Sequence, residues 1–230
     1  IMRWGLDWIL AVAQAVSEFE GALSHVPAPG AWVLPLFAAG MLFAVIWQGR
    51  LRLAGLLPAA SALLMWGAAE RPVVLIADSG GLVGVMAPEG RALSRAKGQG
   101  FIAKIWLEND GDPAGQIAAA ARWREETDAL PVWQGPGFRL VHAPGKRKLA
   151  QASTCKKGDI VVSTVTAQTP ENCLLLTPAV MRQTGSIAVT TTGGLQTSRS
   201  VSGQRLWTGW QPEGAEISRL RRIIGQESPQ

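Results

Sequence analysis

The sequence predicts an α/β protein in which two transmembrane helices precede a layered globular domain. Three observations support this prediction. Two long stretches near the start, His25 to Gly49 and Leu53 to Ala69, carry no formal charge. Residues 71–230 hold 19 of the 22 lysines and arginines and 13 of the 17 acids. Within that part, short apolar runs alternate with turn residues, and a strand–helix–strand unit near its end is typical of layered α/β domains.

The two uncharged stretches predict membrane-spanning helices at about residues 31–49 and 53–69. A spanning helix needs about 20 largely apolar residues. Trp32, Trp47 and Trp66 stand near the ends of these stretches, where aromatic side chains mark the membrane interfaces. A buried core helix is the alternative for each stretch. With an amphipathic helix at the start of the chain, the spans make up a first domain, residues 1–70.

The location of the globular domain follows from the short loop between the predicted spans. Arg50 and Arg52 lie in this loop, and basic residues in short loops favour the cytoplasmic face of a membrane. Both flanking parts are then expected on the outer side, so the globular domain would be periplasmic or extracellular. The isoleucine that precedes Met2 indicates a chain cut from a longer protein, and an altered start is the alternative.

The two cysteines, Cys155 and Cys173, both lie in the globular domain. An oxidising compartment would favour a disulfide between them. Closing a loop of this size stabilises a fold by about 3 kcal/mol in the chain-entropy view. Two buried free thiols are the alternative.

The globular domain is expected over residues 71–212, followed by a basic tail at 213–230. Its apolar runs predict strands at Val73–Ala77, Leu82–Ala87, Phe138–Ala143 and Asp159–Val165. A further unit comprises a short strand from Cys173, a helix opened by Thr177 and Pro178, and a strand from Ser186. The first two of these runs are too apolar for a sheet with one face in water, so both faces of that sheet are expected to be covered.

The segment "WLENDGDP", Trp106 to Pro113, raises the question of a metal site. It does not fit the calcium-loop template, because Pro113 and Ala119 occupy the positions that require glycine and glutamate. Asp112 as an N-cap with Pro113 at the first helical position is the structural interpretation. Asp110 has no role in it. A magnesium site built from Asp78, Asp110 and Asp112 is the rival interpretation.

Other catalytic signals are weak. The chain has two histidines, His25 and His142, too few for a zinc hydrolase centre. The cysteines lack CxxC spacing, and neither a nucleophile elbow nor a phosphate-binding loop occurs. The residues therefore predict no catalytic group, no metal ligand and no cofactor.

A basic cluster lies around the Pro144–Gly145 turn and Cys155. It could follow a phosphate backbone without reading sequence. A solvated loop, or a surface facing anionic lipid, is the alternative. The candidate DNA-contacting residues are Lys146, Arg147, Lys148, Lys156 and Lys157.

The order of these features resembles the C-terminal part of the ComEC family, the inner-membrane channel that carries single-stranded DNA inward during natural transformation. The similarity rests on several short motifs in sequence. They are "PAPGAW", "QGRLR", "RPVVLIADSGGLVGVMAPEGRALS", "WLENDGD", a cysteine before "DIVV", another before a short helix, "GSIAV" and "RLWTGW".

This resemblance implies a metallo-β-lactamase-like αββα sandwich after the two transmembrane helices. Members with nuclease-type domains carry an HxHxDH metal motif, which is absent here. The resemblance therefore implies a catalytically inactive domain. In this domain a Cys155–Cys173 disulfide would take over from the metal the role of stabilising the fold. The expected location is the bacterial inner membrane, multi-pass, with the domain periplasmic. The expected partners are single-stranded DNA, the membrane, the rest of the channel and other competence proteins.

Three hypotheses follow. The first is the C-terminal portion of a DNA-uptake channel with an inactive soluble domain. The second is a membrane-anchored hydrolase or nuclease that uses the aspartate-based magnesium site. The third is a purely structural periplasmic module without affinity for nucleic acid.

Overall fold

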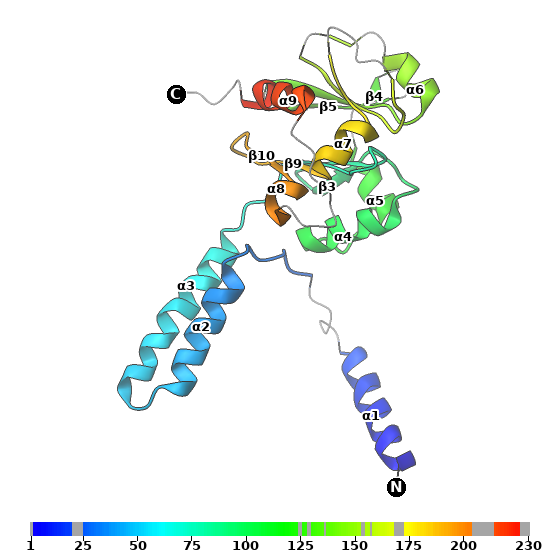
Figure 1. Ribbon diagram of the computed structural model, residues 1–230. Coiled ribbons are helices and arrows are strands. Elements are labelled where there is room, and N and C mark those ends of the chain that lie inside the picture. Colours follow the sequence, from blue (N-terminus) through cyan, green and yellow to red (C-terminus); the bar gives the residue numbers. More distant parts are fainter. Residues whose placement is uncertain are drawn as a thin grey trace.

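The computed structural model describes residues 2–19, 25–123, 126–127, 130–135, 137–152, 155–156, 158–167, 173–203 and 214–225. In these ranges a helix at the start, a helical hairpin and a two-sheet domain follow one another along the chain (Figure 1). The predicted boundary between domain and tail at residues 212 and 213 lies outside the described residues.

The hairpin consists of α2 (Val33–Ile46) and α3 (Leu56–Gly67), joined through the 3₁₀ helix η1 (Arg50–Gly55). Gly40 and Gly55 allow the two helices to touch. A Cβ atom added to Gly40 would lie 2.6 Å from the Gly55 carbonyl oxygen, and one added to Gly55 would lie 2.7 Å from the Ala44 nitrogen. The outward side chains are apolar and exposed, among them Leu34, Val45 and Leu64.

The prediction of two transmembrane helices is wrong. α2 has 14 residues and α3 has 12, or about 21 and 18 Å of helix, against roughly 30 Å of bilayer hydrocarbon. Within the described ranges, none of the helices combines the length and the apolar character that a membrane crossing requires. The predicted spans were too long because the chain becomes extended at Trp47 and adopts a positive φ at Gly49.

The domain contains two five-stranded sheets. Sheet 1 has the order β10–β9–β1–β2–β3 and is antiparallel throughout. Sheet 2 has the order β4–β5–β6–β7–β8, and its β6–β7 and β7–β8 pairs are parallel. The strands of sheet 1 are β1 (Val74–Ile76), β2 (Val83–Ala87), β3 (Gly90–Leu93), β9 (Ile187–Val189) and β10 (Leu195–Thr197). Those of sheet 2 are β4 (Glu126–Thr127), β5 (Leu130–Gly135), β6 (Phe138–His142), β7 (Ile160–Val162) and β8 (Leu174–Leu176).

The main core lies between the two sheets. Alternate residues point into it from each side, such as Val74 and Ile76 of β1 and Leu140 and Ile160 of sheet 2, each at most 1% exposed. α7 (Pro178–Thr184) and α9 (Ala215–Gly225) both contact β8 and add apolar side chains to this core. The two sheets are stacked as layers in Figure 1.

Helices cover the outer faces of both sheets. α4 (Gly100–Asp110) and α5 (Gln116–Ala121) form a second cluster with the outer residues of sheet 1, including Leu82 and Leu93. α6 (Lys146–Gln151) and the Cys155–Cys173 region cover the outer face of sheet 2 around Val161 and Leu175. The layers are therefore helix, sheet, sheet and helix. This explains why the strands are apolar on both faces.

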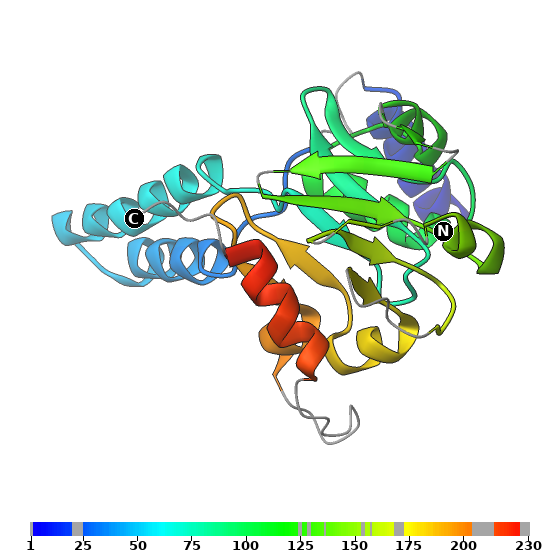
Figure 2. The ribbon, with the colours of Figure 1, turned by 90° about the horizontal axis from the view of Figure 1, so that it is seen from above.

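Figures 1 and 2 show which elements of the domain lie near the α2–α3 hairpin and which lie far from it. α6 lies at the end of the domain farthest from the α2–α3 hairpin in both ribbon views (Figures 1 and 2). α8 (Ser198–Ser202) lies on the hairpin side, below sheet 1. α1 (Met2–Ser17) stands apart from the domain and buries none of its residues.

Candidate functional site

The candidate site is the edge of the sandwich at which β1, β3, β6 and β7 end. Because β6 and β7 are parallel, their carboxyl ends, His142 and Val162, fall at this same edge. Ligand sites of α/β sheets commonly form at the carboxyl ends of parallel strands. The Asp78–Gly81 turn joins the edge from sheet 1.

Gly80 fixes the contact between the two sheets at this edge. Its φ of +63° is disfavoured for other residues, and a Cβ atom there would collide with the Ser163 carbonyl oxygen. The Gly80 carbonyl accepts a hydrogen bond from His142 Nε2 at 3.1 Å. The "DSGG" turn therefore has a packing role that its sequence did not reveal.

His142 is a fully buried residue at the centre of this contact. Burial is the main cause that lowers the pKa of its imidazole to about 4, the Gly80 hydrogen bond opposes the shift, and the positive charges of Arg95 and Lys148 add to it. Its Nδ1 atom has no hydrogen-bond partner among the described residues. His142 is therefore neutral near pH 7 and acts as a structural donor.

We expect His142 to make the fold sensitive to acid. Between its ordinary pKa of 6.5 and the folded value of about 4, the unfolded chain binds a proton that the folded chain does not. The free energy of unfolding must therefore fall as the pH decreases through this window, by about 3 kcal/mol. Urea denaturation from pH 7.5 to 4 should show a flatter profile for His142→Gln, whose amide can still donate to Gly80. Identical pH profiles for the two proteins would contradict this assignment.

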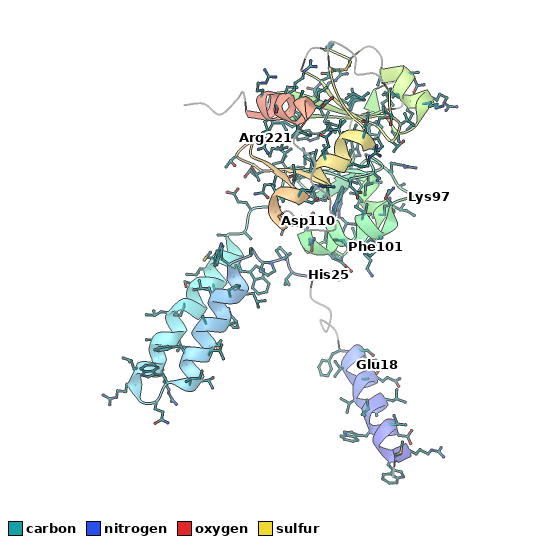
Figure 3. All side chains as sticks on the ribbon, viewed as in Figure 1. Glu18, His25, Lys97, Phe101, Asp110 and Arg221 are labelled. Carbon is teal, nitrogen blue, oxygen red and sulfur yellow. A yellow bond between two sulfur atoms is a disulfide. The ribbon has the colours of Figure 1, made fainter. Side chains whose placement is uncertain are left out.

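Cations from both sheets gather around the same edge. α6 begins directly after β6, so Lys146 and Arg147 are exposed there, and Lys148 is half-buried. Arg95 follows β3 of the opposite sheet, and its Nη1 lies 3.4 Å from the Gly81 carbonyl oxygen. Lys97 lies in the same loop and is exposed; Figure 3 places it on the side of the domain away from the hairpin. We call Arg95, Lys97, Lys146, Arg147 and Lys148 the basic edge.

The basic residues that the sequence analysis grouped around the Pro144–Gly145 turn and Cys155 do not all lie together in the structure. Lys156 precedes the amino end of β7, at the opposite end of sheet 2 from Lys146, and its backbone N–H donates to Asp159. Lys157 lies outside the described residues. In their place the fold adds Arg95 and Lys97. The available signal was the "SRAKG" segment, Ser94 to Gly98, because a strand that follows β2 after a tight turn must end at the same edge as β1.

The magnesium site of the rival interpretation does not form among the described residues. Asp110 is buried and makes a bidentate ion pair with Arg91, which is itself fully buried. Asp112 pairs with Arg122, and this partner lowers the pKa of its carboxyl group. Asp78 is exposed in the turn at the basic edge. In the part of the chain that the structure describes, no three histidine, cysteine or acidic side chains are grouped as a metal site requires.

The helix expected to start at Pro113 begins later. α5 starts at Gln116 with Gly115 as its N-cap. Asp112 instead accepts a hydrogen bond from the Ala114 N–H at 2.9 Å. The "WLEND" segment is the end of α4, which Gly111 closes with a positive φ.

The three tryptophans assigned to membrane interfaces occupy different environments. Trp66 donates its indole N–H to the Pro27 carbonyl at 2.7 Å and so ties the hairpin to the preceding segment. Trp47 stacks on Phe43 with ring centroids 5.0 Å apart. Trp32 is exposed.

Cys155 and Cys173 form a disulfide and are not two free thiols, the alternative that the sequence left open. The bond joins the segment before β7 to the start of β8 on the outer face of sheet 2.

Comparisons with known protein families, with curated proteins and with solved structures found no match.

Proposed function

We propose that this chain is the C-terminal portion of a channel for DNA uptake, and that its two-sheet domain is a non-catalytic element that guides single-stranded DNA. The observation that carries the proposal is the basic edge. Five cations from two different sheets share one edge, beside a turn that both sheets hold in place. Such a surface can follow a phosphate backbone without reading bases.

Two further observations support the proposed setting. A disulfide between two elements of the domain fits an oxidising compartment such as the periplasm. The exposed apolar side chains of α2 and α3 fit contact with the membrane or with the rest of the channel. α6, which carries three cations of the basic edge, lies at the end of the domain away from the hairpin (Figures 1 and 2), as the proposed contact with an incoming strand requires.

A nuclease function is less well supported. Asp110 and Asp112 are each engaged by an arginine, and His142 donates to a backbone carbonyl. These groups hold the fold together, so the proposed role depends on charge and not on bond cleavage.

The proposal is tested by the binding of the full chain to a fluorescent oligothymidine at increasing salt. The logarithm of the binding constant should fall linearly with the logarithm of salt concentration. Lys146→Ala and Lys97→Ala should each weaken binding and reduce this slope by roughly 0.7, the value for one contact to a single strand.

Lys156→Ala is the matched control, because Lys156 is also exposed but lies at the other end of sheet 2. It should leave both the affinity and the slope unchanged. Equal losses for Lys156→Ala and Lys146→Ala would exclude the basic edge as the interface. The absence of salt-dependent binding would favour a purely structural module, and Mg²⁺-dependent cleavage of the oligonucleotide would favour the hydrolase hypothesis.

A further inference from the structure

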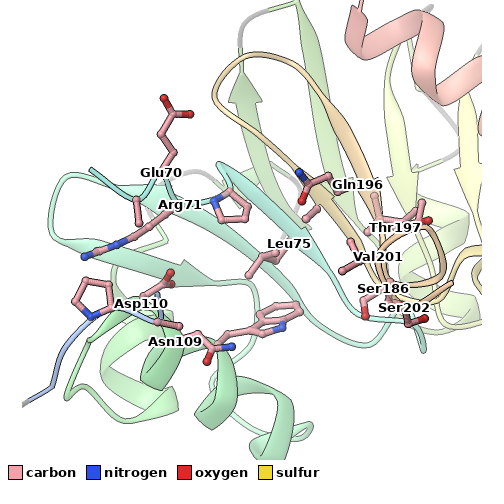
Figure 4. A pocket seen from close by; sticks show the side chains of 18 residues that line it. Glu70, Arg71, Leu75, Asn109, Asp110, Ser186, Gln196, Thr197, Val201 and Ser202 are labelled. Carbon is pink, nitrogen blue, oxygen red and sulfur yellow. The ribbon is translucent and has the colours of Figure 1, made fainter. Parts of the chain in front are cut away.

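A groove of about 440 Å³ lies on the outer face of sheet 1, beside α4. α4 and α5 cover β2 and β3, but the outer face of β1, β9 and β10 lines this groove. Its apolar surface comes from Leu75, Trp106 and Val201, the last of which is 75% exposed. Figure 4 shows Leu75 and Val201 on either side of the hollow, with polar residues such as Gln196 and Glu70 around it.

α1 has the complementary property. Arg3, Asp7, Gln14 and Glu18 follow one another at helical spacing, and neighbouring members of this polar stripe pair with each other. At 100° per residue, the opposite face is entirely apolar. Its large side chains are 45–84% exposed. They are Trp8, Ile9, Val12, Val16 and Phe19, with Trp4 at the border to the polar stripe.

The chain that leaves α1 is fixed at the rim of this groove. Pro27 and Ala28 are part of its lining. The Ala28 N–H donates to the Asn109 carbonyl at 2.8 Å, and the Pro27 carbonyl accepts from Trp66. The seven residues 20–26 can span at most about 25 Å when extended, so α1 is held within reach of the groove. A short tether of this kind gives a high effective concentration.

We propose that α1 packs its apolar face into this groove of its own chain and completes the helix layer over sheet 1. The contact buries Leu75 and Val201 together with the apolar face of α1, and it leaves the polar stripe of α1 in water. The driving force is the removal of apolar surface from water on both partners. We assign the groove to α1 because the segment that follows α1 ends in the lining of the groove, at Pro27 and Ala28.

Disulfide trapping in the full chain tests the contact. Val201→Cys is combined with one cysteine on α1, and the yield of the link within one chain is measured after mild oxidation by non-reducing gels and peptide mapping. The native cysteines are already paired with each other. Scanning six positions makes the result independent of the register of α1 in the groove. The apolar-face set is Trp8, Val12 and Val16, and the polar-face set is Asp7, Gln14 and Glu18.

We expect the best apolar-face position to link about tenfold more than the best polar-face position, and to do so with or without vesicles of anionic phospholipid. Val12 and Gln14 are matched in distance along the helix but differ by about 200° around it. Equal yields on both faces would overturn the proposal. Links found only between two chains would assign the groove to a second copy. Loss of the apolar-face link in the presence of vesicles, with a blue shift of tryptophan emission, would assign α1 to the membrane surface.

Discussion

Replacing Asp110 with alanine is expected to lower the free energy of unfolding by about 3–5 kcal/mol, because the change leaves the buried guanidinium of Arg91 without its counter-charge. Arg91 is fully buried, and Asp110 accepts hydrogen bonds from two of its nitrogens. The remaining partner is the Pro72 carbonyl at 3.1 Å. The loss is measured by urea denaturation followed through circular dichroism.

Two further variants make the Asp110 prediction specific. Asp112→Ala breaks the pair with Arg122, whose side chain is 17% exposed, so water compensates part of the lost charge and the cost is smaller. The double variant Arg91→Met with Asp110→Leu removes both charges and should recover most of the stability. If Asp110→Ala lowers the free energy of unfolding no more than Asp112→Ala does, the buried Arg91–Asp110 pair does not stabilise the fold as described.

Removing the disulfide is expected to cost about 3 kcal/mol, since it closes a loop of seventeen residues in the unfolded chain. Cys173 is almost fully buried, and Cys155 packs against the same outer cluster of sheet 2. The double variant Cys155→Ala with Cys173→Ala removes the bond without leaving a free thiol. Its urea midpoint should lie below that of the native chain.

A reducing agent provides the control for the disulfide. It should lower the midpoint of the native chain toward that of the double variant and leave the double variant unchanged. Alkylation of two free thiols in protein from an oxidising compartment would contradict the disulfide.

Much of the architecture could be predicted from local patterns. Apolar runs bounded by glycine, aspartate and proline located β1, β2, β6 and β7, and the Thr177–Pro178 signal located α7 within a residue. These elements depend on neighbouring residues only. The hairpin was also visible as two uncharged stretches. Its helices are shorter than these stretches, because the backbone leaves the helical conformation from Trp47 to Gly49.

The role of Asp110 could not be predicted, because its partner Arg91 is nineteen residues earlier and on a strand whose register was unknown. The same applies to the basic edge. Arg95 and Lys148 stand 53 positions apart in the chain, and Arg95 acts on His142 because the two sheets stack at Gly80. Conversely, Lys146 and Lys156 are close in sequence but lie at opposite ends of a parallel pair.

The sequence by itself determined the α/β class, the positions of most strands and the amphipathic nature of α1. These properties depend on period, turn residues and composition, which are local. Only the tertiary structure decided which charges neutralise each other, which cations share an edge and which apolar face is left uncovered. Electrostatic and packing energies depend on distance through space, and for residues on different sheets that distance is set by strand register and by the stacking of the layers.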